Sequence, residues 1–447
     1  MGGEWLKCTL ADACSSIDYG LTASAADHQN GPYFLRITDI VSGHIDWNTV
    51  PHVDADEATL AKYRLHDGDI VLARTGASTG ASAYVKKPPS AVFASYLVRL
   101  QSKPNFDSRF LSYYLRSDNF WTFIRAVLGD KSAQPNASAS TMTKAPLCVP
   151  NNKNEQRRIA HILGTLDDKI ENNRKTAKTL EAMAQAIFQS WFVDFDPVRA
   201  KMAGESPESI CKRLKLTLEI LDLFPDRLVD SELGEIPDGW LTTTLETITS
   251  RIKRGISPAY SDGYGILILN QKCIREFMVD TSKARRHDPA VRSIEGLLLE
   301  VGDVLVNSTG VGTLGRVAQV LHIQESCIID SHVTLVRPDN KYPWSYLGQL
   351  IMTLQPQIEE MGEGSTGQTE LSRGKLANLL ITLPITSILE KYHNIILPVN
   401  GRISDCERQI QILKNIRDTL LPKLISGEIR VPEACHVEGS YNAAYHG

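Results

Sequence analysis

The sequence of 447 residues lacks the features of secreted, membrane-spanning and zinc-binding proteins. No stretch approaches about 18 consecutive apolar residues, and the first residues lack the basic flank and apolar run of a signal peptide. We therefore expect a cytoplasmic protein without a membrane span. The eight cysteines include no C-x-x-C pair, which favours reduced thiols over a zinc knuckle or a disulfide framework.

Motifs of several catalytic classes are also missing. The chain has no Asn/Asp-Pro-Pro-aromatic motif for methylating amino groups, no G-x-x-x-x-G-K-[ST] phosphate loop and no Glu-x-Lys nuclease element. Gly76–Gly80 is rich in glycine, but no lysine follows it, which favours a turn. The histidines between His28 and His66 lack metal-ligand spacing, and Asp167 and Asp168 are expected to be solvated on a helix surface. We expect a non-catalytic chain that itself binds no metal or cofactor.

Positive charge is concentrated in two segments of a chain whose formal net charge is -4. Residues 84–144 hold nine Lys or Arg against three Asp, and residues 251–292 hold nine against four acidic residues. Either island alone is best interpreted as ordinary solvated surface. Two such islands in an acidic chain favour two regions that bind a polyanion such as nucleic acid.

The chain contains an internal duplication, which bears on any assignment of fold. GDIVLARTG at Gly68–Gly76 returns as GDVLVNSTG at Gly302–Gly310. The same separation along the chain relates Gln134 to Gln368. Two copies are too few for a solenoid, so the repeat predicts two similar halves related by a pseudo-twofold axis.

Each half begins with short apolar runs separated by Gly, Pro and Asp, a pattern typical of strands and turns. The predicted strands are residues 69–73, 92–100, 266–269, 304–306 and 332–336. In residues 109–127 and 345–358 the apolar side chains have helical spacing instead, which predicts a helix in each half. Each half is therefore expected to start with an α+β domain.

The halves end in segments whose apolar residues follow the heptad repeat of a coiled coil. The first is regular for about four heptads, whereas the second begins just after Pro398 and is shorter and less regular. The predicted seam positions are Ile159, Leu163, Leu166, Ile170, Asn173, Leu180, Ile187 and Trp191, followed by Ile403, Ile410, Leu413, Leu420 and Leu424. We expect the two helices to pack against each other in antiparallel orientation, with Asn173 fixing their register. Packing of each helix on its own domain is the alternative.

The expected fold class is thus α+β, with two pseudo-twofold-related α+β domains separated by two long antiparallel coiled-coil helices. A helix over residues 159–191 would be about 50 Å long at a rise of about 1.5 Å per residue. One turn of B-DNA is about 34–36 Å long, so two basic domains held at such a separation suit two half-sites with an unread gap. Because the domains differ in sequence, the half-sites are expected to differ as well.

Four segments carry a pattern that is specific to one protein family. They are LGTLDDKIENN at 163–173, WFVDFDP at 191–197, LGEIPDGW at 233–240 and LPKLISGEI at 421–429. The first two resemble the central conserved region of the specificity subunits of type I restriction-modification enzymes. The third resembles the start of their second target recognition domain, and the fourth resembles their distal conserved region. With the repeated Gly-Asp-x-x-x-x-x-Thr-Gly element, the resemblance covers roughly residues 1–431.

The resemblance implies a DNA-binding subunit without a catalytic site, part of a defence against foreign DNA. Its two target recognition domains would read the halves of a split, asymmetric sequence in double-stranded DNA. Two methyltransferase subunits, which methylate adenine with S-adenosylmethionine, would dock on it, and restriction subunits would join for ATP-dependent translocation and cleavage. S-adenosylmethionine, ATP and Mg2+ are therefore expected in the partner subunits. Arg417, Cys406 and Pro398 depart from the family's pattern, and we expect them to weaken and shorten the distal helix.

Candidate DNA contacts follow from the chemistry of recognition, in which Arg and Lys bind guanine or phosphate and Asn and Gln bind adenine. In the first half they are Arg74, Thr75, Ser78, Lys86, Lys87, Lys131, Gln134 and Asn136. In the second half they are Lys253, Arg254, Lys272, Arg285, Arg286, Ser308, Arg316, Gln368 and Arg373. A shared structural hydrogen bond explains the repeated Gln134 and Gln368 equally well.

Composition divides the chain into recognition domains, conserved helices, a linker and a tail. The expected bounds are 1–152 and 232–386 for the domains, 153–198 and 387–429 for the helices, 199–231 for a helical linker and 430–447 for a disordered tail. Phe188, Phe192 and Phe195 exceed what one seam can cover, so we expect them to contact the methyltransferase subunits. Burial against the chain's own second half is a nearly equal alternative.

Two other functional classes fit parts of the sequence. A coiled-coil adaptor with two protein-binding domains and no DNA readout would show the same heptads, but no salt-dependent affinity for DNA. A self-sufficient nuclease or methyltransferase would need active-site residues that the sequence does not show.

Overall fold

The computed structural model describes residues 5–26, 28, 30–129, 136–310, 312–363 and 369–431. The chain forms two compact units, the first made of Met1–Asn172 and Ile410–Gly447 and the second of Asn173–Gln409. Both boundaries fall inside the two longest helices, α6 (Lys153–Phe188) and α13 (Thr386–Ser426). Each unit therefore holds one segment of either helix.

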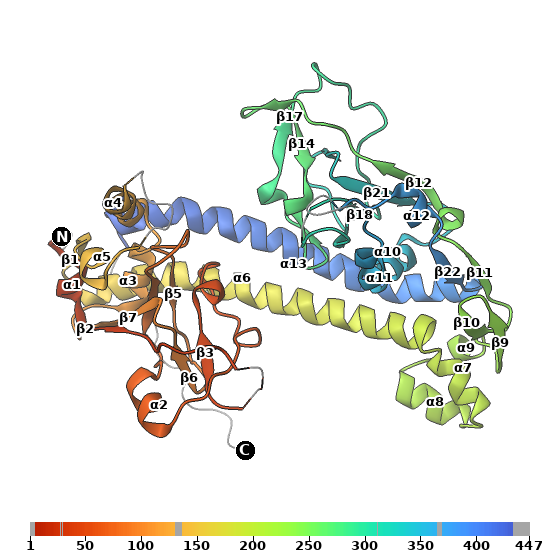
Figure 1. The fold of residues 1–447 in the computed structure, drawn as a ribbon, viewed down its shortest axis with the longest axis horizontal. Coiled ribbons are helices and arrows are strands. Elements are labelled where there is room, and N and C mark those ends of the chain that lie inside the picture. Colours follow the sequence, from red (N-terminus) through yellow and green to blue (C-terminus); the bar gives the residue numbers. More distant parts are fainter. Residues whose placement is uncertain are drawn as a thin grey trace. The chain divides into compact units, whose positions relative to one another are not determined.

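The first unit is built around a four-stranded antiparallel sheet (Figure 1). Its strand order is β2 (Cys14–Tyr19), β7 (Leu97–Ser102), β4 (Ile70–Ala73) and β5 (Ser82–Tyr84). Two further pairs are β1 (Trp5–Thr9) antiparallel to β8 (Pro146–Pro150) and β3 (Tyr33–Leu35) parallel to β6 (Ala91–Phe93). The helical elements are α1 (Leu10–Ala13), η1 (Ile37–Asp39), α2 (Glu57–Tyr63), α3 (Ser108–Tyr114), α4 (Asp118–Leu128) and α5 (Ala139–Met142).

The second unit repeats this topology, as the sequence duplication predicts. Its corresponding sheet has the order β12 (Thr249–Arg254), β21 (Val333–Pro338), β18 (Val304–Asn307) and β19 (Val317–Gln319). The equivalent pairs are β11 (Leu241–Thr244) antiparallel to β22 (Leu380–Leu383) and β14 (Ile266–Leu269) parallel to β20 (Cys327–Ile329). The remaining elements are η3 (Leu245–Ile248), β13 (Tyr260–Ser261), η4 (Gln271–Cys273), β15 (Ile274–Arg275), β16 (Met278–Val279), η5 (Thr281–Lys283), β17 (Arg285–His287), α10 (Trp344–Thr353), α11 (Gln355–Glu360) and α12 (Arg373–Ala377). The expected α+β fold class is confirmed.

The segment between α6 and β11 belongs to the second unit. Its elements are a π-helical turn η2 (Gln189–Val193), α7 (Asp196–Met202), α8 (Pro207–Leu214), α9 (Leu218–Leu221), β9 (Leu228–Ser231) and β10 (Gly234–Pro237). Val198, Ile210 and Phe224 from this segment are buried in the core of the unit. The segment is thus helical, as predicted, but it is packed rather than a bare linker. The predicted tail, beyond residue 431, lies outside the described residues.

The edge strands β2 and β12 correspond residue by residue. A Cβ atom on Gly20, which follows β2, would lie 2.2 Å from the carbonyl oxygen of Ala94. On Gly255, which follows β12, it would lie 2.1 Å from the carbonyl oxygen of Ile329. Each strand also has a register shift between its first and third residues. These shared features align the two strands, and Gly20 and Gly255 are equivalent positions in this alignment.

The repeated Gly-Asp element is structural. Gly68 and Gly302 have φ of +92° and +97°, a conformation that favours glycine. The carboxylates of Asp69 and Asp303 are buried, and each accepts the backbone N–H three residues earlier, at 2.9 and 2.7 Å. The element therefore closes the turn that leads into β4 and β18, and its repetition reflects the shared scaffold.

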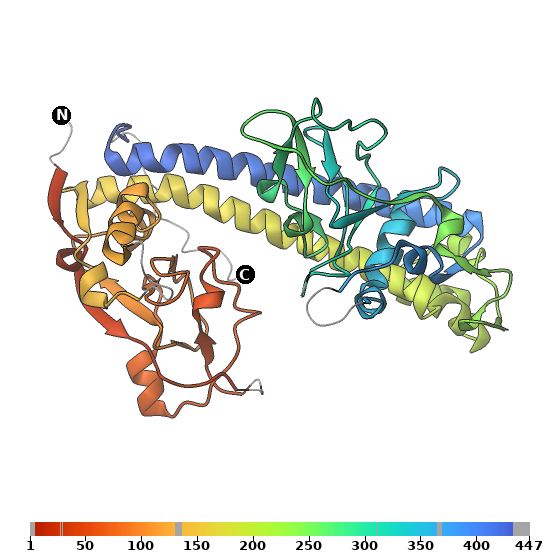
Figure 2. The same ribbon diagram turned by 45° about the horizontal axis from the view of Figure 1, so that its top comes forward.

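The segments of α6 and α13 run antiparallel within each unit (Figures 1 and 2). In the first unit, Arg417 of α13 donates to Asp167 of α6 at 2.8 Å. In the second unit, the buried Asn173 donates its side-chain N–H to Oε1 of Gln409 at 3.0 Å. The residue numbers rise along α6 while those of the partners fall along α13, which confirms the predicted antiparallel pair. The contact of Asn173 suits its predicted role in fixing register.

Most of the predicted seam residues are covered. Ile159, Leu163, Ile170, Asn173, Trp191, Ile403, Ile410 and Leu424 are buried, and Leu166, Leu180, Ile187, Leu413 and Leu420 are half-buried. Cys406, which was expected to weaken the seam, is buried beside Ala177 and Ile403. Ile159 and Leu163 also join the α+β core of the first unit, so each helix packs on its own domain as well as on its partner.

Helix α13 has bounds close to the expected 387–429, but it begins earlier than its heptad pattern. It spans 41 residues, against 36 for α6, and continues through Pro398 instead of beginning after it. Proline lacks a backbone N–H donor and crowds the preceding turn, so it usually interrupts a helix. Ile388, Tyr392 and Ile396 precede Pro398 on this helix and are buried in the core of the second unit. Tertiary packing of these turns outweighs the local cost of the proline.

Asp167 attaches α6 to its surroundings in the first unit, which corrects the prediction that it is solvated. It accepts hydrogen bonds from Tyr113 at 2.7 Å and from Arg116 and Arg417 at 2.8 Å. Burial by itself would raise the pKa of Asp167, but Arg116, Arg417 and the Tyr113 hydroxyl hold that pKa below its ordinary value. The ionised carboxylate therefore connects three separate elements.

Asp168 makes a second attachment of the same kind. It accepts hydrogen bonds from Lys86 at 2.8 Å and from Arg109 at 2.9 Å. Burial alone would raise its pKa, but the two cations lower that pKa below the ordinary value. Arg109 also donates to the carbonyl oxygen of Gly164 at 3.1 Å, and a Cβ at Gly164 would lie 2.4 Å from the guanidinium carbon. Only glycine at this position gives the arginine room.

The aromatic cluster at the end of α6 is covered by the second half of the chain. Phe188, Phe192 and Phe195 are at most 7% exposed and belong to the core of the second unit. The ring centroid of Phe192 lies 5.0 Å from that of Tyr392 and 5.9 Å from that of Trp240. This burial corrects the prediction that these side chains contact methyltransferase subunits. The sequence pattern alone does not show which surface covers an apolar cluster.

Candidate nucleic-acid interface

Three of the predicted DNA contacts meet at the end of strand β4 in the first unit. Thr75 forms an isolated β-bridge with the exposed Asn136, and the carbonyl oxygen of Arg74 accepts the N–H of Ala137 at 3.0 Å. The guanidinium of Arg74 lies 4.9 Å from the ring centroid of Tyr19, at cation–π distance. A guanidinium, a hydroxyl and an amide thus share one edge of the domain, a combination suited to base edges and phosphates.

The glycine-rich stretch after β4 is a turn, as predicted. The N–H of Thr79 donates to the carbonyl oxygen of Gly76 at 3.0 Å, and Gly76 and Gly80 both have positive φ. Ser78 is half-buried within this turn, and its carbonyl oxygen accepts the N–H of Ala81 at 2.9 Å. Ser78 and Thr75 therefore belong to the same loop after β4.

The other candidates of the first half do not join this group. Lys86 is ion-paired with Asp168 at 2.8 Å, so it helps to attach the domain to α6. Lys87 is exposed and has a φ of +42°. Lys131 and Gln134 lie outside the described residues.

The corresponding end of β18 carries different side chains. Thr309 forms an isolated β-bridge with Glu370, as Thr75 does with Asn136. Arg254 donates to the carboxylate of Glu370 and, at 3.0 Å, to a neighbouring carbonyl oxygen. Ser308 is 0% exposed and its hydroxyl bonds to that of Thr334, which removes it from the candidate contacts. A cation and a carboxylate here replace the amide of the first unit.

Strand β17 carries two further candidates. The guanidinium of Arg285 lies 3.3 Å from the ring centroid of Tyr260, and the side chain is exposed. Arg286 is ion-paired with Glu325 and also donates to the carbonyl oxygen of Gly265 at 2.8 Å. Arg285 is therefore better placed than Arg286 to meet an external anion.

The remaining candidates of the second half belong to other elements and loops. Lys253, Lys272 and Arg373 are exposed. Arg316 is half-buried and donates to the carbonyl oxygen of Gly312 at 2.6 Å. Gln368 lies outside the described residues.

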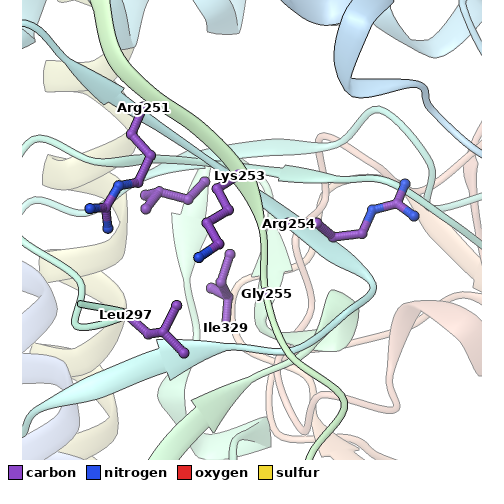
Figure 3. Close-up of a pocket in the computed structure, with 7 residues that line it drawn as sticks. Arg251, Lys253, Arg254, Gly255, Leu297 and Ile329 are labelled. Carbon is purple, nitrogen blue, oxygen red and sulfur yellow. The ribbon is translucent and has the colours of Figure 1, made fainter. Parts of the chain in front are cut away.

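A row of cations follows the edge strand β12. Arg251, Lys253 and Arg254 line a shallow depression together with Leu297 and Ile329, among others (Figure 3). In Figure 3, Lys253 lies between the two arginines, which point to opposite sides. Arg251 was not among the candidates, although it falls in the second basic island. Arg251 stands out only when β12 is aligned with β2. In that alignment the cations of β12 correspond to uncharged and acidic residues of β2.

Arg251 also lines a second, larger hollow. This hollow has a volume of ≈ 420 Å³ and lies between the segments 246–252 and 372–377. Arg373 contributes a second guanidinium, and the other lining residues include the hydroxyl-bearing Thr249, Ser250 and Ser372. The hollow thus combines two cations with small hydrogen-bonding side chains.

Comparisons of this chain with known proteins all find similarity to one family. Residues 4–182 match the family described as Type I restriction modification DNA specificity domain. The specificity subunit of the type I restriction enzyme MjaIX from Methanocaldococcus jannaschii is 25% identical over 335 residues, which are 73% of this chain and 70% of that protein. The specificity subunit of the HindI enzyme from Haemophilus influenzae is 22% identical over 95% of this chain and its own full length. The predicted resemblance to type I specificity subunits is confirmed.

The fold of this chain is also similar to that of a solved structure. The crystal structure of the S subunit of a type I restriction-modification system from M. genitalium matches 94% of this chain and 96% of its own, with a TM-score of 0.54 and 16% identity. Among the residues that the structure describes, no three His, Cys, Asp or Glu side chains are grouped so as to hold a metal ion. No helix among the same residues is both long and apolar enough to cross a membrane.

Proposed function

We propose that this chain reads a split, asymmetric sequence in double-stranded DNA, one half with each recognition domain. Residues 1–152 and 232–386 are the two readers, and the helix pair joins them. The chain is a non-catalytic subunit, on which two methyltransferase subunits and the restriction subunits assemble in the cytoplasm. S-adenosylmethionine, ATP and Mg2+ are bound by those partners.

One observation carries this proposal: the two units share a scaffold but differ at equivalent surface positions. The β-bridge at the end of β4 joins Thr75 to Asn136, and the bridge at the end of β18 joins Thr309 to Glu370. An amide side chain can bind adenine through two hydrogen bonds, whereas a carboxylate accepts from the amino group of cytosine. Equivalent positions with different hydrogen-bonding chemistry suit two readers of two different half-sites.

The cations of the second unit favour DNA over protein as the ligand. Lys253, Lys272 and Arg373 are exposed, and none of them forms an ion pair among the described residues. Unpaired cations on a chain of net charge -4 indicate a local attraction for a polyanion. A coiled-coil adaptor with two protein-binding domains would not require them.

We expect co-expression of the chain with the methyltransferase subunit of its system to yield adenine methylation at one split, asymmetric motif. The motif is mapped across random DNA by single-molecule sequencing. Exchanging residues 1–150 for those of a related specificity subunit should change one half of the motif and leave the other half and the spacer unchanged. The matched exchange of residues 232–386 should change only the other half. A continuous motif, or a single exchange that alters both halves, would refute the two-reader mechanism.

A further inference from the structure

We propose that Arg251 and Lys253 of β12, together with Arg373 of α12, form a clamp for the phosphate backbone of DNA that the first unit lacks. The two recognition domains would then hold DNA with unequal electrostatic strength. This inference rests on the proposed function, and it specifies which contacts are independent of base sequence. We call these three residues the phosphate clamp.

The two aligned edge strands have opposite charge. In the alignment that matches Gly20 with Gly255, Arg251 corresponds to Ser16 and Lys253 corresponds to Asp18. The carboxylate of Asp18 is ion-paired with an arginine on the neighbouring strand at 2.8 Å. The edge strand of the first unit is therefore neutralised within its own sheet and offers no cation to a ligand.

Within the described part of the chain, two of the three cations of β12 have no such ion pair, whereas the third, Arg254, is paired with Glu370. Arg251 donates to the carbonyl oxygen of Gly296, an uncharged acceptor. Lys253 lies opposite Leu335 in the sheet and forms no ion pair among the described residues. Arg251 lies opposite Arg337, whose charge is already balanced by Asp303 at 2.8 Å. The charges of Arg251 and Lys253 are thus not balanced by a carboxylate among the described residues, which leaves them available to an external anion.

The hollow beside Arg251 has the chemistry of a phosphate contact. Its ≈ 420 Å³ are lined by Arg251 and Arg373, by three side chains with hydroxyl groups and by one carboxylate, Glu246. Phosphate oxygens in protein–DNA complexes accept hydrogen bonds from Arg, Lys, Ser and Thr. Arg373 is exposed at the start of α12 and has no ion-pair partner among the described residues, so its guanidinium is available.

The linear arrangement of the charges favours a polyanion over a single small anion. Arg251 and Lys253 are two residues apart on an extended strand, which separates them by about 7 Å along the edge. Figure 3 shows their side chains leaving the strand at separate points. A cradle for one phosphate would converge on a single point, whereas a row of cations can follow successive phosphates of one DNA strand.

The test uses the full chain in complex with its methyltransferase subunit. The double variant Lys253→Gln and Arg373→Gln removes two exposed cations, and the matched control Lys212→Gln and Lys341→Gln removes two exposed cations from elsewhere in the same unit. Binding to a duplex with the methylated motif and to a scrambled duplex is measured by fluorescence anisotropy over a range of salt concentrations. Thermal melting of all variants checks that they fold.

We expect the clamp variant to lose affinity for both duplexes by the same factor. Its slope of log K against log salt concentration should be smaller than that of the wild type by about two, since each phosphate contact contributes about 0.9. The control should keep the wild-type slope. A wild-type slope in the clamp variant, or a loss confined to the duplex with the motif, would overturn the clamp.

A further measurement separates DNA from a small anion as the ligand. Inorganic phosphate is added at constant ionic strength to DNA complexes of the wild type and of the clamp variant. If phosphate releases the same fraction of DNA from both proteins, the clamp is supported. If phosphate displaces DNA from the wild type alone, the site binds a single anion and the clamp is overturned. Failure of the proposed function is distinct, because the wild-type complex would then bind both duplexes alike and methylate no defined motif.

Discussion

Replacing Asp167 by alanine should lower the free energy of unfolding of the first unit by about 2–3 kcal/mol. The carboxylate accepts hydrogen bonds from Tyr113, Arg116 and Arg417. Its removal leaves the half-buried guanidinium of Arg116 without its ion-pair partner and leaves Arg417 paired with the exposed Asp418 alone. Such a loss exceeds that of an exposed pair because the two guanidinium groups are only partly solvated. Asp167 is itself 24% exposed, which keeps the expected cost below that of a fully buried pair.

Urea unfolding at neutral pH measures this cost. The matched control is Asp405→Ala on α13, which removes an exposed pair with Arg408 and should change stability by less than about 0.5 kcal/mol. Because the pKa of Asp167 is lowered in the folded chain, its contribution is present above the ordinary value of 3.8 and is lost as the pH falls through the folded pKa. An Asp167→Ala variant as stable as the control would contradict the proposed attachment.

The features that were predictable from the sequence are those that local pattern determines. The duplication preserves Gly68 and Asp69 because a positive φ and a buried carboxylate close the same turn in both units. The heptads predicted the antiparallel helices because the apolar spacing of a helix reports which face is covered. The polar Asn173 was identified in the same way, as an interruption of that spacing.

The errors concern features that depend on distant parts of the chain. Asp167 lies between the apolar heptad positions of α6, where a side chain is usually solvated. Its arginine partners come from α13 and from the segment between α3 and α4, which the local sequence does not show. Phe192 suggests an interface because the residues that cover it, such as Tyr392, belong to the other half of the sequence. Pro398 predicts a helix start from local geometry, which tertiary packing overrides.

The candidate site was only partly accessible to sequence reasoning. Residue chemistry selects Arg74 and Asn136, and the structure brings both to one edge. The same reasoning selected Ser308, which is buried, because burial at a strand end is not encoded by residue type. It missed Arg251, because a single arginine in a basic island carries no signal until its strand is aligned with its repeat.

The position equivalent to Asp167 is uncharged in the second unit. The heptads of α6 and α13 align with Ile170 against Ile403, which places the buried Asn400 where the first unit has Asp167. An amide carries no charge, so it cannot repeat the ion pairs of the first unit. The helix pair of the second unit therefore has a different electrostatic character.

The helix pair of the second unit contains a half-buried carboxyl group, Glu181 of α6. Burial, and then the charges of Glu407 and Glu276, raise the pKa of Glu181 to about 7. All three causes disfavour the ionised form, whereas the cations around Asp167 favour it. The contributions of Asp167 and Glu181 to stability should consequently depend on pH in opposite directions.

Replacing Glu181 by glutamine should therefore stabilise the second unit at alkaline pH by about 3 kcal/mol, since about 1.4 kcal/mol corresponds to each pKa unit. The folded pKa of about 7 lies above the ordinary 4.5, so the folded chain binds the proton more tightly than the unfolded chain. Stability is full below 4.5, falls as the pH rises towards about 7 and is constant beyond it. Glutamine mimics the protonated group and removes this loss.

The prediction is checked by urea unfolding of wild type and variant between pH 5 and pH 8. At pH 5 the two proteins should differ by less than about 1 kcal/mol, and the difference should grow to its full value by pH 8. Glu390→Gln, an exposed substitution on α13 of the same unit, should show no such growth. A difference that does not depend on pH would assign the effect to packing instead of charge. A growing difference would show that the second unit, with Glu181 among acidic neighbours, loses stability as the pH rises through neutrality.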